Sequence, residues 1–253
     1  MKLPSIENFR DFGGYPARAG VLARGVLYRS ANHSYASDGD LARVRQLGLA
    51  TIVDLRRPSE RLRYPSRRWH GFDVEVIVAD HEFEGTLNWD DFLKRSDHSA
   101  ATFRAYLEGF YREAPFAPRH VELFSRYFER LAQAKGPVLI HCAGGKDRTG
   151  IACALTHVLA GVHEDDLMAD FLATNDPQRI ERVGPAWAQA IGHETGRTPR
   201  LEDLAVAMSV EAGYLHAAFE AIRARHGSVE AYLERALGID SARRAAIESH
   251  ILV

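Results

Sequence analysis

The stretch His141-Cys142-Ala143-Gly144-Gly145-Lys146-Asp147-Arg148-Thr149-Gly150 places five residues between a cysteine and an arginine. An apolar run at 137–140 precedes it and predicts a short buried strand, and the periodic apolar residues of 151–159 predict a helix. The decapeptide therefore occupies a strand-to-helix turn. Backbone N–H groups at the start of a helix carry partial positive charge, so we expect this turn to bind an anion such as phosphate.

Cys142 and Arg148 are predicted to act together on a bound phosphate. A helix N-terminus and neighbouring cations favour the thiolate form of a cysteine, which is the nucleophile. The planar guanidinium of Arg148 can bind two oxygens of a tetrahedral oxyanion. The phosphorus then lies over the sulfur, in position for in-line displacement and a phosphocysteine that water hydrolyses. Thr149 is expected to donate a hydrogen bond to the sulfur and help it leave.

The decapeptide resembles the signature loop of the cysteine-dependent protein tyrosine phosphatase superfamily. The residues at 145–150 resemble the loop sequence of the atypical bacterial branch. Further segments resemble that branch at 8–15, 28–30, 51–56, 161–175 and 226–233. That branch contains secreted mycobacterial and listerial phosphatases that accept phosphotyrosine, in some members phosphoserine or phosphothreonine, and phosphoinositides. The resemblance spans nearly the whole chain, and it implies a phosphatase whose substrates are phosphotyrosine proteins or phosphoinositides.

The other residues of the turn are predicted to surround the phosphate or support the loop. The predicted substrate-binding set is Ala143, Gly144, Gly145, Lys146, Thr149 and Gly150. His141 is expected to hold the loop through hydrogen bonds to backbone carbonyls. A lysine at position 146 is similar to what phosphoinositide phosphatases of the superfamily carry, where it can meet an additional ring phosphate; the alternative is a solvated lysine. Four arginines could extend an anion-binding surface or form one face of a solvated helix: Arg56, Arg57, Arg61 and Arg63.

A leaving alkoxide or phenoxide calls for a general acid, and three carboxyl groups are candidates. Asp147 lies inside the loop, and in the resembled branch this position is thought essential and to act as the acid; the alternative is that it orients Arg148 and caps the helix. Asp80 follows a predicted strand and is the alternative general acid. Asp54 also ends a strand, but Arg56 nearby favours a structural ion pair. We favour Asp147.

Other interpretations of the decapeptide fit less well. A nucleotide-binding P-loop requires Ser or Thr after the lysine, where Asp147 stands. Sulfur transfer of the rhodanese type also uses a cysteine in a cradling loop, but the Thr-Gly pair after Arg148 argues against it. A phosphate-binding pseudophosphatase stays as the non-enzyme alternative. Cys142 and Cys153 are expected to point apart, so we predict no resting disulfide; Cys153 is either a small core residue or a partner thiol during oxidation.

Composition narrows the function classes further. The chain has 253 residues, 46% of them hydrophobic, and a net charge of −2, so it predicts a sizeable core and no general affinity for nucleic acid. No apolar stretch resembles a signal peptide or could span a bilayer, so we expect a cytoplasmic protein without an integral membrane segment, with secretion by a signal-less route left open. No histidine spacing indicates a metal site, and no cofactor is expected. The oligomeric state is not indicated.

Predicted strands at 26–28, 51–55, 73–79 and 137–140 are separated by predicted helices at 37–48, 100–113 and 118–134. This order predicts an α/β fold, with a central, mainly parallel sheet flanked by helices, as in protein tyrosine phosphatases. Glycine pairs and short apolar runs at 9–29 predict a β-hairpin or irregular antiparallel segment. The acidic segment 80–98 predicts a loop or a partly ordered insertion.

The chain after the decapeptide is predicted to be helical, at 163–173, 177–192, 200–224, 228–237 and from Ser241 onward. We therefore expect a single phosphatase domain over 1–253, in which 161–253 forms a helical extension. Proline and glycine breakers flank the uneven segment 176–200, and in the resembled branch the equivalent helices can cover the active site. A lid at 176–200 is thus one prediction, and a plain packed helical pair is the alternative.

Overall fold

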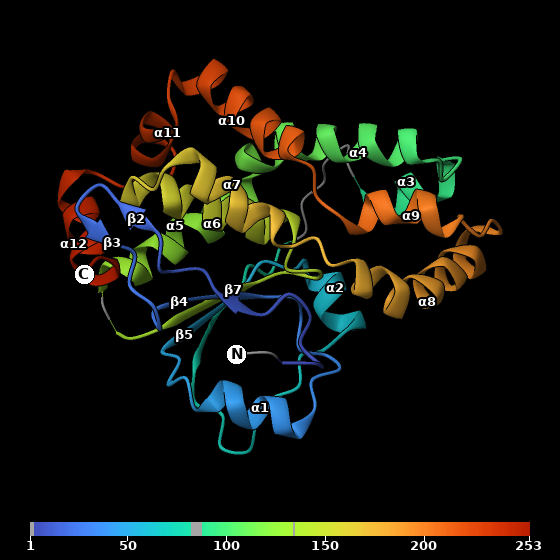
Figure 1. Cartoon of the computed structure of the whole chain (residues 1–253), viewed down its shortest axis with the longest axis horizontal. Helices are drawn as coiled ribbons and strands as arrows, with labels where there is room; N and C mark the ends of the chain where they lie inside the picture. Colours follow the sequence, from blue (N-terminus) through green and yellow to red (C-terminus); the bar gives the residue numbers. More distant parts are fainter. Residues whose placement is uncertain (1–2, 82–87, 134) are drawn as a thin grey trace.

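The computed structural model describes residues 3–81, 88–133 and 135–253 (Figure 1). Its central sheet has the order β1-β4-β7-β5-β6, with β1 at Arg10–Asp11, β4 at Leu27–Ser30, β7 at Val138–His141, β5 at Thr51–Asp54 and β6 at Glu75–Ile77. The four strands from β4 to β6 run parallel, and β1 is an antiparallel edge strand. The predicted α/β fold with a mainly parallel central sheet flanked by helices is confirmed.

Successive side chains of the central strands alternate between two apolar layers, as the two-residue period of a strand requires. On β7, Leu139 packs in one cluster, whereas Val138 and Ile140 pack in the other. The smaller cluster is covered by helix α1 (Asp38–Arg45), which lies alone below the sheet in Figure 1. The predicted N-cap of this helix is confirmed, because the hydroxyl of Ser37 accepts a hydrogen bond from the backbone N–H of Asp40.

Most other helices lie over the opposite face of the sheet (Figure 1). Helix α6 follows β7 directly, and its first turn therefore lies at the carboxyl edge of the sheet. The helices of this layer are α5 (Pro118–Gln133), α6 (Asp147–Ala160), α7 (Glu164–Leu172), α10 (Ala212–His226), α11 (Val229–Arg235) and α12 (Ser241–Ile251). Together with the 3₁₀ turn Ala114–Phe116 and the inner face of α4 (Ala100–Glu113), they bury the larger apolar cluster.

The N-terminal segment forms the predicted hairpin and meets the end of the chain. Strand β2 (Pro16–Ala17) pairs antiparallel with β3 (Gly20–Val21). The backbone of Val21 exchanges hydrogen bonds with that of Val253, at 2.9 and 3.0 Å. Residues before the hairpin run along the carboxyl edge of the sheet, which brings them to the turn between β7 and α6.

A third apolar cluster lies apart from the two layers of the sheet. It is formed by α8 (Pro177–Thr195), α9 (Leu201–Met208), α3 (Trp89–Arg95) and the first turns of α4, and its buried members are Leu93, Phe103, Ala188, Ile191, Leu204, Ala207 and Met208. We call α8 and α9 the cover helices, because both contribute residues to the cavity above the β7–α6 turn. Short helix α2 (Pro58–Arg63) lies at another edge of that cavity.

Two predicted elements were wrong in detail. The single helix predicted at 200–224 is broken into α9 and α10 around Ser209 and Val210. The side chain of Asn175 binds Val210 on both sides, donating to its carbonyl and accepting from its N–H, each at 2.8 Å, and this pairing replaces helical hydrogen bonds. The loop predicted at 80–98 contains α3, which begins at an Asn88 cap; residues 82–87 of that segment lie outside the described residues.

No helix in the described ranges is long and apolar enough to cross a membrane.

Candidate active site

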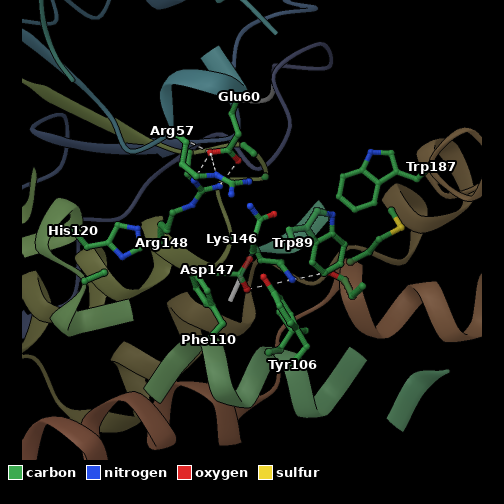
Figure 2. A pocket seen from close by; sticks show the side chains of 18 of the residues that line it. Arg57, Glu60, Trp89, Tyr106, Phe110, His120, Lys146, Asp147, Arg148 and Trp187 are labelled. Atoms are coloured by element: carbon green, nitrogen blue, oxygen red, sulfur yellow. Dashed lines mark hydrogen bonds and ion pairs between the residues drawn. The ribbon is translucent and has the colours of Figure 1, made fainter. Parts of the chain in front are cut away.

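Cys142 follows β7 directly and lies at the wall of a cavity of about 210 Å³. Only 2% of the residue is exposed. The cavity is also lined by other residues predicted for the site: Ala143, Gly144, Lys146, Asp147 and Arg148. The predicted residues Gly145, Thr149 and Gly150 lie outside its lining. Figure 2 shows Arg148 and Asp147 projecting from the start of α6 toward the space between α2 and α4.

The carbonyl groups of the loop are held on its outer side by the N-terminal part of the chain. Asn32 donates to the carbonyl of Ala143 twice, from its backbone N–H at 3.0 Å and from its side-chain amide at 2.9 Å. The side chains of Asn8 and Arg29 donate to the carbonyl of Gly145 at 2.6 and 3.0 Å. Since N–H and C=O point in opposite directions across a trans peptide, the next N–H groups face the inside of the loop. This arrangement is compatible with anion binding by the loop.

Gly145 allows the backbone of the loop to pass close to the backbone of Ser30. Its φ is +63°, and a Cβ there would lie 2.3 Å from the carbonyl oxygen of Ser30. A side chain has no room at that distance, and an L-residue also disfavours this backbone conformation. The loop thus packs directly on the backbone that follows β4.

Arg148 is fixed by a carboxylate from α2. Its Nη1 and Nη2 atoms donate to the two oxygens of Glu60 at 2.6 and 2.8 Å, a two-point pairing that orients the plane of the guanidinium (Figure 2). Burial on its own would raise the pKa of Glu60, but the charges and hydrogen bonds of Arg148 and Arg57 together outweigh burial and lower that pKa to about 2. Burial likewise opposes the charge of Arg148, and Glu60 raises its pKa above the ordinary value.

Glu60 also holds the start of its own helix, because it accepts from the backbone N–H of Arg57 at 2.7 Å. The sequence did not predict the role of Glu60 at this site. Pro58 at the first helical position and Glu60 in the first turn are typical of a helix start, but neither indicated the contact with Arg148.

Asp147 has two partners on the same carboxylate oxygen, Oδ1. The hydroxyl of Tyr111 donates to it at 3.1 Å, and the ammonium of Lys146 lies 3.2 Å away. Burial raises the pKa of Tyr111 well above its usual value, so this hydroxyl stays protonated and acts as a donor. Asp147 is thereby positioned at the cavity wall by a residue of α4.

The side chain of Lys146 is buried and reaches toward the cover helices. Its ammonium donates to the backbone carbonyls of Ala207 and Ser209 at 2.7 and 3.0 Å, in addition to its contact with Asp147. Burial lowers the pKa of Lys146, and the Asp147 carboxylate acts in the opposite direction. Three partners account for the three protons of an ammonium group. Lys146 thus joins the loop between β7 and α6 to the end of α9.

His141, predicted as a supporting residue, and Thr149, predicted to bind substrate, both lie outside the cavity lining. His141 contacts the carbonyl of Cys142 through Nδ1 at 3.3 Å, as expected, and its ring stacks on that of His33. Burial lowers the pKa of His141 to about 4, so its ring is neutral at pH 7. The hydroxyl of Thr149 is buried and has no hydrogen-bond partner among the described residues, so its predicted bond to the Cys142 sulfur is not formed here.

The two other carboxyl candidates lie away from the cavity lining. Asp80 is exposed and pairs with Arg61 at 2.6 Å. Asp54 accepts from Arg56 through both oxygens, which confirms the predicted structural ion pair. Arg56 is fully buried, so it is not part of a surface for polyanions, whereas Arg57 lines the cavity.

Both cysteines are free and buried. Cys153 lies inside α6, where burial raises the pKa of its thiol to about 12.

A buried ion network supports the loop from below. Asp170 of α7 pairs with Arg29 at 2.6 Å and with Arg10 at 2.9 Å. Arg29 then donates to Gly145, while Arg10 donates to the side chain of Asn8. The sequence did not predict these roles. Asn8, Arg10, Arg29 and Asp170 all fall in the segments that carry the family resemblance, and that was the available signal.

The cavity walls away from Arg57 and Glu60 are largely apolar and aromatic. They are formed by Trp89, Tyr106, Leu107, Phe110, Trp187, Ala207 and Met208, of which Trp187 lies on α8 (Figure 2). On the other side of Arg148, burial and the Arg148 charge lower the pKa of His120 to about 4.

The sequence was compared with known families and proteins. It matches the model of the tyrosine phosphatase family over residues 1–253. It is 35% identical over 250 residues to a Cupriavidus necator protein named as a tyrosine-protein phosphatase, covering 96% of this chain and 86% of that protein. It is 32% identical over 270 residues to the triple specificity protein phosphatase PtpB of Mycobacterium tuberculosis, covering 95% of each.

The crystal structure of P. aeruginosa TpbA is 18% identical in sequence and covers 81% of this chain and 97% of its own, with a TM-score of 0.34.

Proposed function

The chain belongs to the tyrosine phosphatase family, in its atypical bacterial branch, and we propose that this protein-tyrosine phosphatase works through a phosphocysteine formed on Cys142. The observation that carries the proposal is the position of Cys142 beneath a loop whose carbonyls are held outward by Asn8, Asn32 and Arg29. That arrangement leaves N–H groups facing a bound phosphate beside the sulfur.

In the first step the Cys142 sulfur attacks phosphorus and the bond to the leaving oxygen breaks. Negative charge on the transferring phosphoryl oxygens meets the loop N–H groups and Arg148, whose orientation Glu60 has already set. In the second step water attacks the phosphocysteine, and inorganic phosphate and the thiolate are released. Because the donors are in place before the substrate binds, little reorganisation is needed during the reaction.

Asp147 is the proposed general acid. Glu60 and Asp147 are the carboxyl groups among the described cavity-lining residues, and the pKa of Glu60, about 2, leaves it no proton to give at neutral pH. The contacts of Tyr111 and Lys146 engage Oδ1 of Asp147. We infer that the transferable proton is carried on Oδ2, from which it passes to the leaving oxygen.

The nucleophile is tested with Cys142→Ser and an aryl phosphate. This variant is expected to lose turnover completely, while the wild type turns over in EDTA at an unchanged rate. Cys153→Ser is the matched control, because the Cys153 thiol is buried in α6 and its raised pKa keeps it protonated. Turnover that survives in Cys142→Ser would refute the mechanism, and so would equal losses in both variants. Phosphate binding without turnover by the wild type would identify a pseudophosphatase.

The general acid is tested by comparing leaving groups. Asp147→Asn is expected to slow esters with poor leaving groups, such as alkyl phosphates, more than aryl esters with good ones. The matched control is Tyr111→Phe, which removes one partner of Asp147 but keeps its carboxyl group. Equal slowing of all esters by Asp147→Asn would show that Asp147 only orients the loop.

The substrate class within the family follows from a specificity panel. We propose phosphotyrosine as the leading substrate because the aromatic walls fit a phenyl ring, with phosphoserine, phosphothreonine and phosphoinositides as further candidates. A comparison of kcat/KM across phosphopeptides and phosphoinositides ranks them, since specificity is a difference in transition-state binding. A higher kcat/KM for phosphoinositides than for every phosphotyrosine peptide would reverse the ranking.

We also propose that 1–253 functions as one phosphatase domain, in which 161–253 forms the helical extension and 176–200 acts as a lid. Residues of α8 line the cavity wall, and the cover helices pack mainly in their own apolar cluster. Deletion of 178–195, in a variant that stays folded, is expected to accelerate inactivation of Cys142 by peroxide. Unchanged inactivation would contradict the lid.

A further inference from the structure

Five cationic side chains line the cavity: Arg57, Arg119, Lys146, Arg148 and Arg179. Four of them are directed at protein groups. Arg148 and Arg57 face Glu60, Lys146 donates to carbonyls of the α9 end, and Arg119 donates to the carbonyls of Leu55 and Arg56. The fifth cation, Arg179, also contacts protein groups, but its Nη2 has no hydrogen bond among the described residues.

Arg179 extends from the first turn of α8 to the rim of the catalytic loop, and 8% of it is exposed. Its Nη1 donates to the carbonyl of Met208 at 3.1 Å, and its Nε lies 3.2 Å from a carboxylate oxygen of Glu7. Its Nη2 lies 3.7 Å from the place where a Cβ would stand on Gly144. Within the described ranges no hydrogen bond is found for this Nη2, which leaves that edge of the guanidinium for a ligand.

We propose that Arg179 binds a second anionic group beside the scissile phosphate, so that the enzyme prefers phosphotyrosine peptides with an acidic residue next to the phosphotyrosine. The inference rests on the proposed function. A guanidinium can pair with separate anions along its different edges, so Glu7 can hold Nε while Nη2 meets the substrate. The two contacts made by Nε and Nη1 fix the side chain in advance, which lowers the entropic cost of binding.

The chemistry of the cavity favours a peptide as the source of this anion. The walls opposite the loop are aromatic, with Trp89, Tyr106 and Phe110 positioned to contact a tyrosyl ring (Figure 2). Arg179 comes from α8, whereas the residues assigned to the scissile phosphate come from the loop and α6. Arg179 thus lies beside the set assigned to the scissile phosphate, and the proposal takes the second anion from the leaving group.

The chain offers a matched control in Arg182. This residue lies one turn further along α8 and donates to the same Glu7 at 2.8 Å, but its side chain is half exposed and does not line the cavity. Arg179→Gln and Arg182→Gln each remove one contact between α8 and Glu7. Arg179→Gln alone removes a guanidinium from the cavity.

The experiment measures kcat/KM for phosphotyrosine peptides that carry Glu, Ala or Lys next to the phosphotyrosine. The wild type and Arg182→Gln are expected to prefer Glu over Ala by about tenfold, the size of one charge-assisted hydrogen bond, and Arg179→Gln is expected to lose this preference. Turnover of para-nitrophenyl phosphate, which has no neighbouring anion, is expected to stay within about twofold in both variants.

Three results would overturn the inference. Absence of a preference for Glu in the wild type would do so, and so would an equal loss on every substrate in Arg179→Gln, which would place Arg179 at the scissile phosphate. A preference confined to a soluble inositol bisphosphate over its monophosphate would assign the second anion to a ring phosphate instead. The proposed function fails separately, when the wild type does not hydrolyse para-nitrophenyl phosphate.

Discussion

The catalytic loop and the cover helices face each other across one cavity, but they are held in place by different forces. The loop is fixed by buried polar contacts, in which Asn8, Arg29 and Asp170 take part. The cover helices α8 and α9 pack in a separate apolar cluster, and their outer links are ion pairs such as Arg182–Glu7 and Arg63–Glu194, whose arginines are half exposed. Exposed ion pairs contribute little stability, so we expect the cover to yield before the loop does, with the buried contacts of Lys146 to Ala207 and Ser209 as the link between the two.

The largest effect on activity is expected from Gly145→Ala in the loop. The new Cβ would overlap the Ser30 carbonyl oxygen at 2.3 Å, and the φ of +63° disfavours alanine. We expect kcat/KM to fall by at least about 100-fold, since small displacements of catalytic groups have effects of that size. Thermal unfolding in parallel with kinetics checks this. A variant that keeps more than a tenth of the wild-type activity would show that the loop is less rigid than its contacts indicate.

The next largest effect is expected from Glu60→Gln. This substitution removes the two-point pairing with Arg148 but keeps a side chain of the same size at that place. A neutral amide cannot pair with both guanidinium nitrogens as acceptors, so kcat/KM should fall by roughly 10- to 100-fold. The matched control is Glu194→Gln. Glu194 lies on α8 and pairs with the half-exposed Arg63 of α2, so its loss should change kcat/KM by less than about twofold. Equal effects from the two substitutions would remove the distinction between loop and cover.

The pH dependence of stability tests the lowered pKa of Glu60. Its folded-state pKa of about 2 lies below the unfolded value of about 4.3, so its stabilising contribution is present above pH 4.3 and is lost as the pH falls toward 2. Glu60→Gln should lack this part of the acid-induced loss of stability. Denaturant unfolding of both proteins between pH 3 and pH 7 measures it. Parallel curves for the two proteins would contradict the depressed pKa.

The loop was predictable from the sequence because its chemistry is local. The spacing of Cys142 and Arg148 and the strand and helix around them are all contained in about twenty residues. The groups that fix the loop are distant in sequence: Asn8 is separated from Gly145 by 137 positions and Glu60 from Arg148 by 88. Their contacts depend on the order of strands in the sheet, which the sequence pattern does not specify.

The break between α9 and α10 shows the same limit for the cover. Residues 200–224 have a helical pattern throughout, so local propensity predicts one helix. Asn175 binds the backbone at Val210, and Lys146 takes the carbonyls of Ala207 and Ser209. These long-range contacts end α9 early. The separate helix α9 packs against α8. In a continuous helix the carbonyls of Ala207 and Ser209 would accept helical hydrogen bonds, whereas here they accept from Lys146.

A smaller effect on turnover is expected from Ile191→Ala, which creates a space inside the cluster of the cover. Ile191 lies on α8 and is 6% exposed. Truncating such a residue costs about 2–5 kcal/mol, and here the cost falls on a cluster separate from the sheet. We expect peroxide to inactivate Cys142 several times faster, with kcat/KM reduced by less than about fivefold.

The control for Ile191→Ala is Ile222→Ala on α10, which removes the same atoms from the main core. It should lower the free energy of global unfolding at least as much, but leave peroxide inactivation near the wild-type rate well below the unfolding temperature. Faster inactivation in both variants would mean that the cover and the core open together.

The smallest effect is expected from Gly196→Ala at the end of α8, and it completes the comparison with Gly145. Both glycines have a positive φ, +75° at 196 and +63° at 145, so alanine carries a similar backbone cost of about 1–2 kcal/mol at each. A Cβ at 196 meets no atom within 4 Å, however, whereas one at 145 meets the Ser30 backbone. Gly196→Ala should therefore lower thermal stability slightly and leave kcat/KM within about twofold of the wild type. A large loss of activity would mean that the end of α8 is coupled to the catalytic loop, and the cover would then belong to the same rigid unit as Cys142.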